Sequence, residues 1–107
     1  MALTAEKRDP ETASAARRRS VSVLGSTGSI GVSTLDLIER EREKFDLVAV
    51  TADENVTSLI EQARRLRPQL AVIGDTLLYD ELKAGLEGTG IEIAAGRDAV
   101  IEAALRP

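Results

Sequence analysis

At 107 residues the chain has room for one small domain, and its composition excludes several classes of function. It contains no cysteine and no histidine, which excludes disulfide frameworks, Cys/His zinc sites, cysteine nucleophiles and Ser-His-Asp triads. The formal charge of −4 argues against a nucleic-acid-binding module, which would need a clustered basic face. No apolar run approaches the roughly 18 residues of a membrane span. Because reducing compartments disfavour disulfides, the lack of cysteine is consistent with the cytoplasmic location that we expect.

Residues 1–20 differ in composition from the rest of the chain. They are rich in Ala, Arg, Glu, Thr and Ser, and only Met1 and Leu3 are larger apolar residues. Such a segment cannot bury enough surface to offset the entropy of ordering, so we expect a flexible leader. The folded domain is expected over residues 21–107.

Short apolar runs alternate with amphipathic segments along residues 21–107. The runs predict strands at residues 21–24, 47–51, 70–73 and 91–93. The amphipathic segments predict four helices. The first covers about residues 29–42, the second runs from an N-cap at Asn55 to a stop at Pro68, the third runs from residues 74–76 to Gly88, and the fourth covers about residues 97–105. The uninterrupted run at 47–51 is typical of a parallel strand buried on both faces, whereas Ile91-Glu92-Ile93 alternates as an edge strand does.

This alternation of strands and helices, joined by right-handed crossovers, predicts an α/β fold with a Rossmann-like, doubly wound parallel sheet. The edge character of residues 91–93 predicts the strand order 4-3-2-1. A central first strand would need a neighbour on its other side. We therefore expect a sheet that is truncated before completion, as in a piece of a longer protein.

The clearest functional signal is the segment Gly25-Ser26-Thr27-Gly28-Ser29-Ile30-Gly31, which lies between a predicted strand and a predicted helix. At this spacing Gly25 would allow the sharp turn off the strand, and Gly28 would let the backbone approach a pyrophosphate. Gly31 would let the helix pack tightly on the sheet. The segment thus predicts a dinucleotide-binding turn, the alternative being an ordinary glycine-rich turn with Ser/Thr caps.

Two further features of this turn bear on the phosphate chemistry. Free N–H groups at the start of the helix would bind phosphate, and Ser26, Thr27 and Ser29 could add hydroxyl donors. No lysine lies between Lys7 and Lys44, which excludes the Gly-Lys-Ser/Thr phosphate loop of nucleotide triphosphatases.

The loop after the second predicted strand would face the adenosine ribose of a dinucleotide. Asp53 is placed to accept a hydrogen bond from a free ribose 2′-OH, which would favour NAD over NADP. Alternatively, Asp53 complements the dipole of the following helix. Asn55 either contacts the ligand or only caps that helix.

The glycine-rich turn belongs to a longer pattern of residues. The run from Ser22 to Gly31, with Thr34-Leu35-Asp36, Phe45, residues 48–52 and Asn55-Val56, resembles the start of the 1-deoxy-D-xylulose 5-phosphate reductoisomerases. Enzymes of that family rearrange deoxyxylulose phosphate and reduce the product to methylerythritol phosphate, using NADPH and Mg or Mn, in isoprenoid biosynthesis. The resemblance implies that the cofactor is contacted by Thr27, Gly28, Ser29, Ile30 and Asn55.

The resemblance also implies what this chain would not contain. The family's metal-binding carboxylates and substrate-phosphate residues lie beyond the point where this sequence ends, so we assign no catalytic and no metal-binding residue. We expect the complete enzyme to be a homodimer and this chain alone to be inactive. The alternatives are another NAD(P)-binding reductase domain, such as a semialdehyde dehydrogenase-like one, and a non-catalytic nucleotide-binding module.

Two positions depart from the family pattern. Many members carry Gly and then Lys or Arg before the asparagine, where this chain has Asp53 and Glu54. A cation there would face the 2′-phosphate of NADPH. The resemblance therefore favours NADPH, while the two carboxylates favour NAD.

Overall fold

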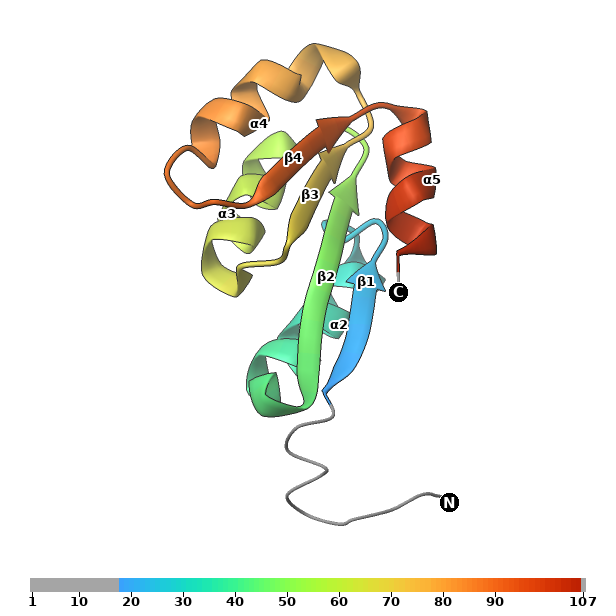
Figure 1. The fold of residues 1–107 in the computed structure, drawn as a ribbon, viewed down its shortest axis with the longest axis vertical. Coiled ribbons are helices and arrows are strands. Elements are labelled where there is room, and N and C mark those ends of the chain that lie inside the picture. The colour runs from blue at the N-terminus through green and yellow to red at the C-terminus, as the bar shows by residue number, and fades with distance from the viewer. Residues whose placement is uncertain (1–17, 107) are drawn as a thin grey trace.

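The computed structural model describes residues 18–106, which form a parallel sheet covered by helices (Figure 1). The strands are β1 (Arg19–Val23), β2 (Phe45–Ala52), β3 (Leu70–Ile73) and β4 (Glu92–Ala95). The helices are α2 (Ser29–Arg40), α3 (Val56–Leu66), α4 (Tyr79–Gly85) and α5 (Arg97–Leu105), with the 3-10 turns η1 (Arg42–Lys44) and η2 (Thr76–Leu78). The predicted alternation of strand and helix is confirmed throughout the described residues.

The four strands are parallel and lie in the order β1-β2-β3-β4, which confirms the predicted order. The first strand begins earlier than the sequence predicts. Arg19 pairs with Phe45 and Ser20 with Asp46, so these two residues belong to β1 rather than to the leader. The remainder of the predicted leader, residues 1–17, lies outside the described residues.

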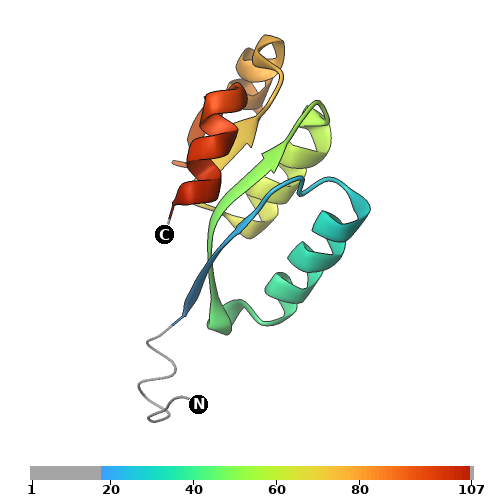
Figure 2. The same cartoon turned by 90° about the vertical axis from the view of Figure 1, so that its right-hand side faces the viewer.

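Helices cover both faces of the sheet, as Figure 2 shows, and this confirms the doubly wound arrangement. On one face, α2, α3 and α4 pack around a large apolar cluster that includes Leu35, Leu59 and Leu82. On the other face, α5 packs through Ala103 against a smaller cluster that includes Leu70. The right-handed crossovers from β1 to β4 all run in the same direction across the sheet, so α2, α3 and α4 lie on one face. α5 follows β4 and runs back over the other face.

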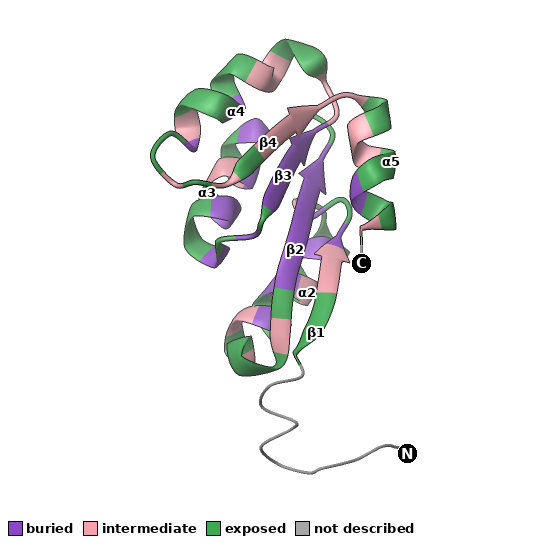
Figure 3. Ribbon diagram, viewed as in Figure 1, coloured by how far each residue is buried: buried purple, intermediate pink, exposed green. Residues whose placement is uncertain are grey.

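Burial follows this layering (Figure 3). β2 is buried from Leu47 onward and β3 along its whole length, because helices cover both of their faces. This coverage explains their uninterrupted apolar sequences. β4 forms one edge of the described sheet, which confirms its predicted edge position, and its residues are exposed or half-buried. The strand covers Glu92–Ala95, so the predicted first residue, Ile91, lies just before it.

The helix ends follow from local chemistry. α3 begins after Asn55, whose Oδ1 accepts a hydrogen bond from the backbone N–H of Ser58 at 3.2 Å. It ends where Arg67 adopts a left-handed conformation, with φ 55°, directly before Pro68. α2 ends at Arg40, two residues before the predicted end, and the chain continues as η1.

The third predicted helix is divided in two, because Asp75 accepts a hydrogen bond from the backbone N–H of Leu77 at 2.9 Å and starts the tighter turn η2 before α4.

Candidate functional site

The glycine-rich turn connects the carboxyl end of β1 to the start of α2, where nucleotides bind in open α/β sheets. Gly25 adopts φ +68°, a conformation that residues with a Cβ rarely adopt, so the predicted sharp turn is confirmed. A Cβ on Gly31 would clash with the carbonyl oxygen of Gly25 and would lie 2.7 Å from the Cα of Ser26. Gly31 therefore permits α2 to pack against the turn itself, rather than against the sheet as the sequence suggested.

A buried polar network fixes the first half of the turn. The Ser26 hydroxyl donates a hydrogen bond to Oε1 of Gln62 on α3 at 2.7 Å, and Nε2 of Gln62 donates to the Ser26 carbonyl at 2.9 Å. Thr51, at the end of β2, accepts two hydrogen bonds from the backbone of the turn. Its hydroxyl accepts from the N–H of Gly25 at 3.1 Å, and its carbonyl accepts from the N–H of Ser26 at 2.7 Å. Because Ser26 is fully buried and its hydroxyl is used inside the protein, its predicted role as a phosphate donor is wrong.

The second half of the turn is open to solvent. Gly28, Ser29 and Ile30 are exposed and Thr27 is half-buried. A Cβ on Gly28 would meet only the Gly25 carbonyl oxygen, at 3.5 Å, so the fold leaves space above this residue. The four residues expected to contact the cofactor, Thr27, Gly28, Ser29 and Ile30, are thus contiguous on an accessible surface.

The start of α2 is suited to an anion. The N–H of Val32 makes the first backbone hydrogen bond of the helix, to the Gly28 carbonyl at 2.8 Å. The preceding N–H groups, from Ser29 to Gly31, have no acceptor within the helix. Its first turn contains no acidic residue and no side chain caps it. This positive, uncapped helix end beside an accessible glycine fits a pyrophosphate.

The loop after β2 lies next to this turn. Asn55 caps α3 through Oδ1, and its exposed side chain keeps the two donors of the amide nitrogen for a ligand. Asp53 lies outside the first turn of α3, and its Oδ1 is 3.2 Å from where a Cβ of Gly74 would be. The Asp53 carboxylate thus lies beside the end of β3 rather than at the end of the helix dipole.

A pocket of about 330 Å³ opens at the carboxyl ends of β2 and β3. The start of α5 closes one side of it. Its lining consists of Asp53, Glu54, Gly74, Asp75, Arg97 and Val100.

Sequence reasoning missed two residues of this region. Gln62 is a polar residue within the buried stripe of α3, between Leu59 and Leu66, and that position was a signal for a buried hydrogen bond. Arg97 directly follows the turn after β4. Because the carboxyl ends of parallel strands share one edge of a sheet, a residue just after the predicted fourth strand is expected near the loop that follows the second, and this was the signal for Arg97.

Among residues 18–106 no group of three or more acidic side chains is arranged to hold a metal ion. In the same part of the chain no helix has the length and apolar character needed to cross a membrane.

Comparisons with known proteins agree on one family. The family model for 1-deoxy-D-xylulose 5-phosphate reductoisomerase matches residues 21–107. A curated reductoisomerase of this name from Caulobacter vibrioides is 59% identical over 86 residues, which cover 80% of this chain and 22% of that protein. One from Rhodospirillum centenum is 56% identical over 89 residues, covering 83% of this chain and 22% of that protein. The chain thus spans less than a quarter of the length of these relatives.

Solved structures give the same result. The Zymomonas mobilis 1-deoxy-D-xylulose 5-phosphate reductoisomerase in complex with NADPH superposes with a TM-score of 0.81 at 50% identity, covering 83% of this chain and 24% of that one. A reductoisomerase in complex with NADPH, fosmidomycin and magnesium superposes with a TM-score of 0.73 at 30% identity, covering 80% of this chain and 21% of that one. The match of the family model to most of the chain shows that this chain belongs to the 1-deoxy-D-xylulose 5-phosphate reductoisomerase family.

Proposed function

We propose that this chain is the NADPH-binding N-terminal portion of a 1-deoxy-D-xylulose 5-phosphate reductoisomerase. The observation that carries the proposal is the uncapped start of α2 beside the accessible Gly28, in a chain that is 50% identical to a relative solved with NADPH. When bound, NADPH supplies the hydride for the reduction. The role of this chain is to bind the cofactor and orient it.

The proposed contacts divide between two loops. The backbone N–H groups of Ser29 and Ile30 bind the pyrophosphate, while Gly28 allows its close approach and the Thr27 hydroxyl adds a donor. Asn55 is held in place by the hydrogen bond that its Oδ1 accepts from the backbone N–H of Ser58, and it uses its amide nitrogen at the adenosine end. The arrangement supports both functions that the sequence left open for Asn55, because capping uses the oxygen and ligand binding uses the nitrogen.

We propose further that the complete enzyme rearranges deoxyxylulose phosphate and reduces the product to methylerythritol phosphate in the presence of Mg²⁺ or Mn²⁺. We also propose that the complete enzyme is a cytoplasmic homodimer. Sedimentation equilibrium of the complete enzyme tests the dimer, and fractionation of cells that produce it tests the location.

The test of cofactor binding uses titration calorimetry with NADPH on the chain and its Gly28→Val variant. The parent chain should bind NADPH. The variant should keep its fold by circular dichroism and bind at least about tenfold more weakly, because its methyl groups occupy the path of the pyrophosphate. Equal affinity in a folded variant would exclude this turn as the site, and absence of binding by the folded parent would contradict the proposal itself.

A further inference from the structure

The proposed cofactor raises an electrostatic problem at its adenosine end. NADPH differs from NADH by a phosphate on the adenosine ribose, and in dinucleotide folds the ribose lies at the loop after the second strand. In this chain that loop presents Asp53 and Glu54, both exposed. Their carboxylates would repel the additional phosphate, and a cation from elsewhere in the fold would offset that repulsion.

The pocket at the carboxyl ends of β2 and β3 contains one such cation. Arg97 lines it together with Asp53 and Glu54, although more than forty positions of the sequence separate Arg97 from these residues. The three residues come together because β2, β3 and β4 are parallel and end at the same edge of the sheet. Arg97 is the first residue of α5, directly after the turn at Gly96, so it faces this edge.

Arg97 is available to a ligand. Its side chain is exposed and makes no ion pair or hydrogen bond with another residue of the described part of the chain. Asp75, which also lines the pocket, uses its carboxylate to accept the N–H of Leu77. A guanidinium keeps its charge at all working pH values and can bind two phosphate oxygens at once. No side chain caps the start of α5, and the carboxylate of Asp98 in its first turn offsets part of the helix dipole, so the charge of Arg97 itself carries the argument.

We propose that Arg97 is a specificity-determining residue that binds the 2′-phosphate of NADPH, in place of the cation that this chain lacks at position 54. The assignment rests on the proposed function, because it requires the cofactor to extend from the glycine-rich turn across the end of β2. It predicts that the preference for a 2′-phosphate comes from α5, on the opposite face of the sheet from α3.

The experiment measures dissociation constants by titration calorimetry for NADPH, NADH, 2′,5′-ADP and 5′-AMP. The variants are Arg97→Gln, Arg97→Lys and, as the control, Lys83→Gln. Lys83 is exposed on α4 and lines a different pocket, so Lys83→Gln makes the same change in net charge away from this site. Urea denaturation of each variant verifies that the fold is retained.

Arg97→Gln should weaken the binding of NADPH and 2′,5′-ADP by about tenfold to a hundredfold. The affinities for NADH and 5′-AMP should stay within about twofold of those of the parent. Arg97→Lys should lie between the two, because it keeps the charge but loses the paired donors. The loss should decrease at high salt, and Lys83→Gln should behave as the parent does.

Two results would overturn the assignment while leaving the proposed function intact. In the first, Arg97→Gln binds NADPH as tightly as the parent. In the second, Arg97→Gln loses affinity for NADPH and NADH equally, which would show that Arg97 contacts a part that the two cofactors share. Failure of the parent to bind NADPH, NADH or 2′,5′-ADP would contradict the proposed function and the Arg97 assignment together.

Discussion

Ser26 and Gln62 hold each other through two hydrogen bonds, at 2.7 and 2.9 Å, although they are 36 positions apart in the sequence. Ser26 is fully buried and Gln62 is 6% exposed. The pair joins the glycine-rich turn to α3, so the conformation of the turn depends on a helix that does not itself contact the pyrophosphate in our proposal.

Replacing Gln62 by Met, which is similar in size, removes both hydrogen bonds and leaves the buried hydroxyl and carbonyl of Ser26 without this partner. We expect the free energy of unfolding to fall by about 2 kcal/mol, since an unsatisfied buried polar group costs about 1–3 kcal/mol. NADPH affinity should fall as well, because the turn loses its fixed conformation. Urea denaturation and titration calorimetry measure the two effects.

The neighbouring variant Glu61→Gln is the control for Gln62→Met. Glu61 is exposed and its ion pair with Arg65 is 3.6 Å long, so its loss should change stability little. If Gln62→Met matched this control in both stability and NADPH affinity, the hydrogen bonds to Ser26 would not determine the conformation of the turn.

Gly31→Ala and Gly28→Ala form a matched pair that separates packing from ligand access. A Cβ at Gly31 clashes with the backbone of the turn, whereas at Gly28 it meets only an oxygen at 3.5 Å. We expect Gly31→Ala to lower the free energy of unfolding by about 3 kcal/mol, and Gly28→Ala to change it by less than about 1 kcal/mol. Thermal and urea unfolding of both variants test this, and equal stabilities would contradict the described packing of α2.

Glu54→Lys tests how strongly the acidic loop opposes NADPH. At about 7 Å and an effective dielectric constant of 20, a carboxylate and one phosphate charge repel each other by roughly 2 kcal/mol before screening. The variant should therefore increase the preference for NADPH over NADH, mainly through tighter binding of NADPH. Dissociation constants for both cofactors at two salt concentrations give the measurement. A preference that does not change at low salt would place Glu54 away from the 2′-phosphate.

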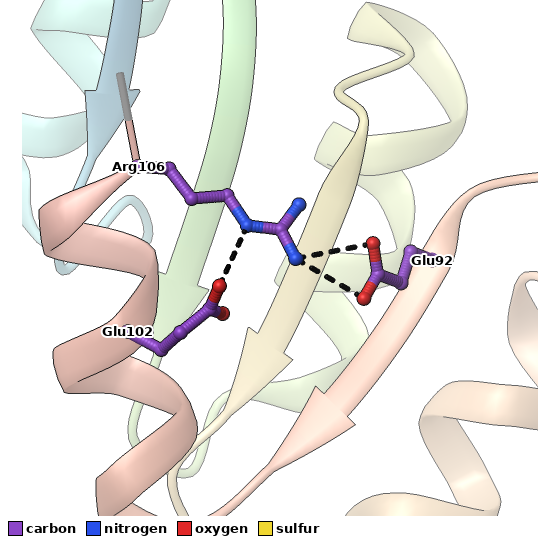
Figure 4. Close-up of polar contacts among 3 residues, drawn as sticks. All are labelled: Glu92, Glu102 and Arg106. Carbon is purple, nitrogen blue, oxygen red and sulfur yellow. Dashed lines mark hydrogen bonds and ion pairs between the residues drawn. The ribbon is translucent and has the colours of Figure 1, made fainter.

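Arg106 joins the end of α5 to the start of β4 (Figure 4). Its guanidinium donates to Glu92 at 3.1 and 3.2 Å and to Glu102 at 3.0 Å, and the hydrogen bond to Glu92, followed by that to Glu102, raises the pKa of Arg106 above its ordinary value. Because the folded pKa is raised, this contribution to stability is present at neutral pH and is lost as the pH rises through the pKa of Arg106 in the folded protein, at strongly alkaline pH.

We expect Arg106→Gln to loosen α5 and to increase amide hydrogen exchange at Ala103, the buried residue of that helix, while exchange at Leu59 in α3 stays unchanged. High salt should reproduce part of the effect in the parent, because the ion pairs are partly exposed. Equal exchange at Ala103 in parent and variant would show that apolar packing alone holds α5.

The sequence by itself determined the order of strands and helices, the parallel sheet, the turn at Gly25 and the cap at Asn55. These features depend on side-chain periodicity and on backbone preferences within a few residues, so they can be inferred from local patterns. The ends of elements were less accurate. The start of β1 at Arg19 depends on pairing with β2, and the division of η2 from α4 depends on the hydrogen bond that Asp75 accepts.

Only the tertiary structure decided which polar groups of the site remain available to a ligand. Ser26, Thr27 and Ser29 are equivalent donors in the sequence, but the hydroxyl of Ser26 is used by Gln62 on α3. In the same way, Arg97 is one of many exposed charged residues until the shared edge of the parallel strands brings it to the pocket of Asp53. Both relationships join residues far apart in the chain. No local pattern records them, because they exist only once the helices have packed on the sheet.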